Sequence, residues 1–114
     1  PYLRATQTAK ILRKAFELKK DSIIETELLS PLGFADQLIN EINEKHNEAQ
    51  SIILVGHEPY LSQLISVLVS GDANMSLNFK KGGVCRLSVD QLRYGRCATM
   101  DWMLSPSQLV EFSD

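Results

Sequence analysis

The stretch around His57 has the residue types and the spacing that phosphate chemistry uses. The apolar run 53–55 ends on Gly56, and His57 stands between that glycine and Pro59, a residue typical of the first turn of a helix. A helix N-terminus carries unpaired N–H groups and partial positive charge, so it attracts anions. A histidine there can donate to a phosphate oxygen or act as an acid or base, unless it only satisfies a loop carbonyl.

Arg4 is the second candidate, in the first turn of the opening helical pattern. A guanidinium can hold a phosphate with two parallel hydrogen bonds, which a lysine cannot imitate. The alternative is an exposed surface arginine without a function. That is the interpretation for the other arginines we considered, which are Arg13, Arg86, Arg93 and Arg96.

Other catalytic motifs are absent. His57 and Glu58 begin like a zinc protease signature, but Leu61 stands where its second histidine belongs. The other histidine, His46, lies in a polar stretch and is expected to be solvated. The sequence has no G-x-S-x-G elbow and no lysine-bearing phosphate loop. We therefore do not expect a zinc site.

The elements that would position these residues follow from hydrophobic spacing. Helices are predicted from Leu3 to about Lys19, over 34–46, and from Pro59 to just before Gly71. Strands are predicted over 22–28, 51–55, 84–90 and 97–104, the last two joined by a hairpin turn at Gly95. The segment 72–83 is predicted to be mostly loop, and the tail 105–114 to hold one helical turn.

This order predicts one domain over 1–114 with a three-layer α/β/α sandwich and a mostly parallel sheet. The run 51–55 would be a central strand buried on both faces, and the hairpin an antiparallel edge. In the second hairpin strand, Ala98, Met100, Trp102 and Leu104 would share one face. Such a unit normally begins with a strand, and here that first strand is absent.

Composition narrows the classes of partner. The net charge is −2, with 12 basic and 14 acidic residues, which argues against nucleic acid. No apolar run of about 18 residues is present, so no membrane span is expected. Cys85 and Cys97 lie in strand-like stretches and are expected to be reduced, buried thiols. We expect a monomer that acts in the cytoplasm.

Read together, two stretches resemble the histidine phosphatase superfamily, whose fold is phosphoglycerate mutase-like. PYLRATQTAKIL (1–12) resembles its "SPYLRAxQTA" segment, and VGHEPYLSQL (55–64) resembles its second histidine motif. The sequence is most similar to the SixA-type phosphohistidine phosphatases within that superfamily. Three further phrases look like that group, and the resemblance covers essentially all 114 residues: LLSPLG (28–33), KKGGVCRL (80–87) and WMLSP (102–106).

The resemblance implies a phosphatase that removes phosphate from the phosphohistidine of signalling proteins. A nucleophilic histidine attacks phosphorus and becomes phosphorylated, and water then releases phosphate. Arg4 matches the arginine of the "YLRA" motif and would clamp the phosphate. His57 matches the histidine of the second motif and would bind the phosphoryl group. The resemblance implies no metal and no cofactor.

One defining motif of the superfamily is not in this sequence. Its Arg-His-Gly follows the first strand, upstream of "YLRA", and carries the nucleophile. The sequence opens on Pro1 and contains no Arg-His-Gly. We therefore expect that segment to lie outside this sequence, and the chain alone to be inactive.

Two glutamates leave alternatives open. Glu27 could be a general acid, as in members that cleave phosphate esters, or a solvated residue at a strand end. Glu58 could cap the helix that follows or orient His57. The alternative functions are a phosphatase of small phosphate esters and a fragment that binds phosphate without catalysis.

Overall fold

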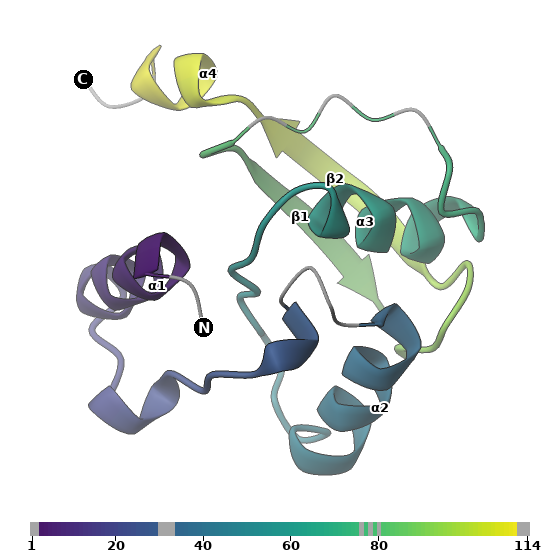
Figure 1. The fold of residues 1–114 in the computed structure, drawn as a ribbon, viewed down its shortest axis with the longest axis horizontal. Coiled ribbons are helices and arrows are strands. Elements are labelled where there is room, and N and C mark those ends of the chain that lie inside the picture. The colour runs from purple at the N-terminus through teal and green to yellow at the C-terminus, as the bar shows by residue number, and fades with distance from the viewer. Residues whose placement is uncertain (1–2, 30–33, 76, 78, 80, 112–114) are drawn as a thin grey trace.

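The computed structural model describes residues 3–29, 34–75, 77, 79 and 81–111, and these form a mixed α/β structure (Figure 1). Its regular elements, in chain order, are the helices α1 (Leu3–Ala15), α2 (Ala35–Lys45) and α3 (Tyr60–Ser70), the strands β1 (Val84–Val89) and β2 (Ala98–Leu104), and the helix α4 (Pro106–Glu111). Short 3-10 turns occupy Lys20–Ser22 and Glu27–Leu29. None of the described helices has the length and apolar character needed to cross a membrane.

The core lies between α2, α3 and one face of the hairpin. Both helices place apolar residues at helical spacing on one side, and these form a single buried cluster of Leu38, Ile39, Ile42, Tyr60, Leu64 and Leu68. From the hairpin, Leu87 and Ala98 pack against this cluster. Two hydrogen bonds tie the hairpin to the helices, from Asn43 Nδ2 to the Leu92 carbonyl (2.9 Å) and from Cys97 N–H to the Leu68 carbonyl (2.9 Å).

The predicted helices are confirmed, and their ends have visible causes. Helix α3 ends at Gly71, which has a left-handed φ of 81° and donates its N–H to the Val67 carbonyl at 2.8 Å. Helix α1 stops at Ala15, short of the predicted Lys19, and Glu17 beyond it has a positive φ of 56°. The tail also forms its predicted helical turn, as α4.

The predicted hairpin is confirmed as an antiparallel pair, with Gly95 at a positive φ of 116° in its loop. The predicted shared face of β2 is wrong beyond Met100. Arg86 pairs with Trp102 and Leu87 pairs with Met100, so Asp101 is an extra residue in the ladder. An extra residue reverses the alternation of side chains, and Trp102 is consequently exposed.

The two strands predicted over 22–28 and 51–55 are not formed. Residues 22–28 run from the end of one 3-10 turn to the middle of the next, with an irregular connection between the turns. Residues 51–55 are irregular throughout. Ile52 and Ile53 are 45% and 53% exposed, which corrects the prediction of a strand buried on both faces. Strands form only when a neighbour pairs with their backbone, and no described segment pairs with either stretch. The described residues therefore contain a two-stranded antiparallel sheet and not a three-layer sandwich with a parallel sheet.

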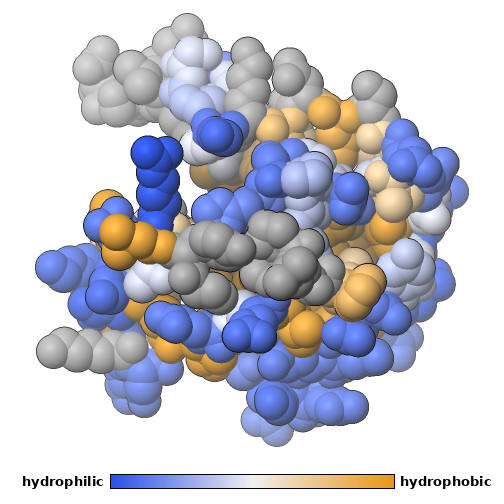
Figure 2. All heavy atoms as spheres, in the orientation of Figure 1, coloured by the Kyte–Doolittle hydropathy of each residue, from blue (hydrophilic) through white to orange (hydrophobic). Residues whose placement is uncertain are grey.

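Helix α1 is packed differently from α2 and α3. None of the residues described in it is buried, and its Leu3 and Ile11 side chains are exposed. Figure 2 shows apolar surface among polar side chains at the edge of the molecule where α1 lies in Figure 1.

Candidate functional site

His57 lies where the sequence predicts, between the irregular segment 51–55 and the start of α3. Its carbonyl accepts the N–H of Leu61 at 3.1 Å, which anchors its backbone to the first turn of the helix. The side chain is half-buried, and its Nε2 atom is shielded from solvent. The structure thus holds this imidazole at the predicted corner, in a partly enclosed position.

Glu58 caps α3, one of the two roles considered for it. One carboxylate oxygen accepts the Ser62 N–H at 2.9 Å, and the other accepts the Ser62 hydroxyl. Ser62 is the third residue of the helix, whose amide has no partner within the helix itself. The cap therefore stabilises the turn that carries His57.

Most of the backbone N–H groups at the start of α3 already donate hydrogen bonds within the chain. This corrects the expectation that they are unpaired and attract an anion. Leu61 N–H donates to His57, Ser62 N–H to Glu58, and Gln63 N–H to the Pro59 carbonyl (3.1 Å). An anion at this corner cannot use amides that are already bonded, and it also meets the negative charge of Glu58. Recognition of a phosphate here would depend on the side chain of His57 and on cations from elsewhere.

At Gly56, the turn before His57 approaches the 3-10 turn that begins with Glu27, the residue considered either as a general acid or as solvated. A Cβ at Gly56 would lie 3.3 Å from the Leu29 carbonyl oxygen and 3.4 Å from Leu61 Cδ2, so the backbone approach is close. The turn before His57 therefore packs against the 3-10 turn Glu27–Leu29. Glu27 is exposed at the start of that turn, whose Leu28 N–H donates to Thr26 Oγ1 at 3.2 Å. The two segments meet even though 22–28 is not a strand.

Arg4 lies in the first turn of α1, as predicted, and its side chain is exposed. Within the described part of the chain, its guanidinium makes neither a hydrogen bond nor an ion pair. Figure 1 shows α1 at the edge of the molecule, on the side where the 51–57 segment runs. The structure therefore places Glu27 and His57 on adjoining segments but does not join Arg4 to them.

Residues that could hold a metal do not gather in the described ranges, where no group of three His, Cys, Asp or Glu side chains is found. Cys85 and Cys97 are free thiols, as predicted, but they are half-buried, which corrects the prediction that they are buried. Burial, followed by the negative charge of Asp101, raises the pKa of Cys85. That thiol is consequently protonated near neutral pH and a poor nucleophile.

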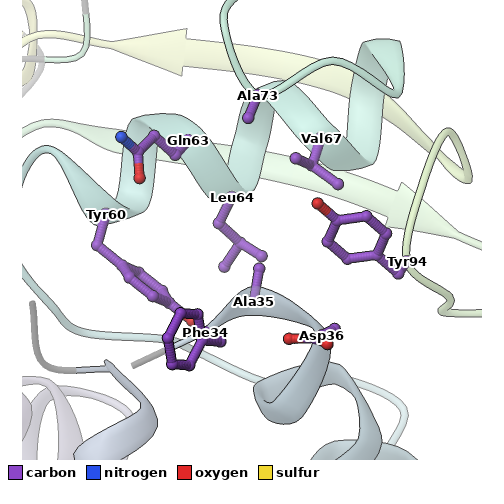
Figure 3. A pocket seen from close by; sticks show the side chains of 9 residues that line it. All are labelled: Phe34, Ala35, Asp36, Tyr60, Gln63, Leu64, Val67, Ala73 and Tyr94. Atoms are coloured by element: carbon purple, nitrogen blue, oxygen red, sulfur yellow. The ribbon is translucent and has the colours of Figure 1, made fainter. Parts of the chain in front are cut away.

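Sequence reasoning missed a pocket of about 500 Å³ that lies against α3 (Figure 3). Its walls come from α3, from the start of α2 and from the hairpin loop, and its lining residues are Phe34, Ala35, Asp36, Tyr60, Gln63, Leu64, Val67, Ala73 and Tyr94. Arg4, Glu27 and His57 are not among them. Phe34 begins the range predicted to be helical, but it precedes α2 and is exposed.

The resemblance to the histidine phosphatase superfamily rests on the sequence motifs at 1–12 and 55–64. Comparisons with protein-family models, with curated proteins and with solved structures find no match to this chain.

Proposed function

We propose that the chain is the phosphate-binding part of a histidine phosphatase that acts on the phosphohistidine of signalling proteins. The observation that carries the proposal is the corner built by Gly56, His57 and Glu58. A capped helix start and a close backbone approach hold one histidine in a defined, half-buried position. A surface histidine without a function needs no such support.

In this proposal, an Arg-His-Gly segment that precedes the chain supplies the nucleophile. Its imidazole attacks phosphorus, the bond from phosphorus to the substrate imidazole breaks, and the leaving nitrogen takes up a proton. Water then cleaves the phosphohistidine intermediate and releases phosphate. His57 and Arg4 donate to the phosphoryl oxygens and stabilise the negative charge of both transfers.

The same proposal extends to the sheet. A preceding strand could pair with the segment 51–55, which is irregular here, and cover the exposed Ile52 and Ile53. The segment would then become the central strand of a parallel sheet in a three-layer sandwich. The two free thiols support a reducing compartment, and we therefore propose that the protein acts in the cytoplasm.

A specific observation supports a second candidate, a phosphatase of small phosphate esters. The turn that begins with Glu27 packs against the turn that carries His57, through Leu29 and Gly56. A carboxylic acid there could protonate a leaving alcohol, which a phosphohistidine substrate does not require. Ester turnover that falls at least about tenfold in Glu27→Gln, with phosphohistidine turnover unchanged, would favour this candidate.

Titration of the chain with inorganic phosphate, followed by backbone amide NMR shifts, tests the binding part of the proposal. Hydrogen bonds to a charged group contribute about 1.5–3 kcal/mol each, so His57→Ala and Arg4→Ala should each weaken binding about tenfold or more. His46→Ala and Lys10→Ala are the matched controls, and they should leave the affinity unchanged. Equal losses in a variant and its control would contradict the assignment.

A catalytic test needs a chain that includes an Arg-His-Gly segment. Turnover of a phosphohistidine protein should then exceed turnover of small phosphomonoesters, and it should fall in His57→Ala and Arg4→Ala. Unchanged turnover in both variants would remove these residues from the site.

A further inference from the structure

The pocket in Figure 3 is lined mainly by aromatic and apolar side chains, which differ from the side chains that bind phosphate. Three aromatic side chains converge on it from separate segments: Phe34 before α2, Tyr60 at the start of α3, and Tyr94 in the hairpin loop. Its volume of about 500 Å³ falls in the range of small-molecule sites, roughly 300–1,000 Å³. Tyr94 is 56% exposed, so a ligand can reach and cover its ring.

Among the described residues that line the pocket, the charge is negative. Asp36 supplies a carboxylate, and no lysine, arginine or histidine is among the described residues that line the walls. The faces of aromatic rings add negative electrostatic potential, which attracts cations. An anion would be repelled, and a neutral apolar ligand would shield the carboxylate from water without supplying a positive charge.

Tyr60 does not alter this balance. Its side chain is buried, and its hydroxyl has no hydrogen-bond partner among the described residues. Burial, followed by the negative charge of Asp36, raises the pKa of Tyr60, so the phenol stays neutral. The hydroxyl is shielded from solvent, and a ligand would therefore meet the ring of Tyr60. Asp36 is the charged group of the pocket.

We propose that this pocket binds a small organic cation, an ammonium or guanidinium group carried on an apolar body. The cation would lie near the Asp36 carboxylate and against the exposed ring of Tyr94, while its apolar part covers Leu64 and Val67. The proposal is independent of the phosphatase assignment, because none of the residues considered for phosphate lines the pocket.

Choline and its uncharged carbon isostere, in which a tert-butyl group replaces the trimethylammonium group, form a matched pair of probes. Backbone amide NMR shifts of Gln63 and Val67 report on the walls. Choline should give saturable shifts there, and the isostere should bind at least about fivefold more weakly. Equal affinity for both probes, or no saturable shift with choline, would overturn the proposal.

Two substitutions separate the charge from the ring. Asp36→Asn keeps the shape and an oxygen that can accept the Gln37 N–H, and Tyr94→Leu keeps an apolar side chain. Each should weaken choline binding about fivefold while the remaining amide spectrum is preserved. Asp90→Asn and Trp102→Leu, at exposed positions outside the pocket lining, should bind choline like the unchanged chain. Unchanged binding in both pocket variants, or equal losses in the controls, would contradict the proposal.

Discussion

Helix α1 and the pair α2–α3 have similar apolar spacing and different surroundings. Leu38 and Leu64 face each other's helices in a buried cluster, whereas Leu3 and Ile11 remain exposed. The difference teaches that an amphipathic pattern predicts a helix but not what covers its apolar face. In proteins most of a helix's stability comes from packing, so the two regions should respond very differently to substitution.

The same contrast divides the proposed phosphate ligands. His57 belongs to the packed region, where Glu58 and Gly56 hold its turn, and Arg4 belongs to the exposed α1. A held imidazole is ready to bind, while an exposed guanidinium must lose side-chain entropy to do so. His57 should therefore contribute more to phosphate affinity than Arg4.

The largest expected effect comes from truncating matched leucines in the two regions. Leu38→Ala creates a cavity at a side chain that is 2% exposed, and it should lower the free energy of unfolding by about 2–5 kcal/mol. Leu3→Ala removes a side chain that is 73% exposed, and it should change that free energy by less than about 0.5 kcal/mol. Urea unfolding followed by circular dichroism measures both. Similar losses would show that α1 is packed in solution.

Ser66 tests the polar support of the packed region. Its fully buried hydroxyl donates to the Asp72 carbonyl and accepts the Met75 N–H at 2.8 Å, which ties the loop after α3 to the helix. Ser66→Ala leaves that amide without its partner and should cost about 1–3 kcal/mol of unfolding free energy. Ser51→Ala, at an exposed position, is the control and should be neutral by the same urea measurement. A neutral Ser66→Ala would mean that water replaces the hydroxyl.

Glu58 tests the helix cap that both stabilises α3 and supports the turn of His57. Glu58→Ala removes both hydrogen bonds to Ser62 and should lower the free energy of unfolding by about 0.5–2 kcal/mol, as other lost helix caps do. Thermal unfolding measures this loss, with Glu48→Ala at an exposed position as the control. The same variant removes a negative charge at this corner, so the weaker phosphate binding that we expect can come only from the loosened turn of His57. A loss of stability with unchanged phosphate binding would separate the cap from the site.

Tyr60 gives the smallest effect, and it depends on pH. The folded state keeps the phenol proton above the ordinary pKa of about 10, where the unfolded state loses it. The unfolded state then binds fewer protons, so stability falls as the pH rises above that value. Tyr60→Phe should lose this alkaline decrease and be equal or up to about 1 kcal/mol more stable near neutral pH, because its buried hydroxyl has no described partner.

Urea unfolding at several pH values checks this prediction, with Tyr94→Phe as the control on an exposed ring. The control should retain the alkaline decrease. If Tyr60→Phe retained it too, the decrease would belong to other groups.

Local patterns in the sequence predicted the helices, the hairpin and the corner at His57. Spacing along α2 and α3, the left-handed Gly71 and the turn at Gly95 act within a few residues, so they can be recognised without knowledge of the fold. The position of His57 ahead of a helix could be predicted in the same way, as could the capping role considered for Glu58.

Tertiary structure alone decided the features that need partners distant in the sequence. Whether 22–28 and 51–55 become strands depends on what pairs with them, and strand propensity cannot supply that partner. The bulge at Asp101, the contact between Gly56 and Leu29, and the occupied amides of α3 likewise arise from three-dimensional contacts. The aromatic pocket is the extreme case, because its three rings come from segments that only the packing of α2, α3 and the hairpin brings together.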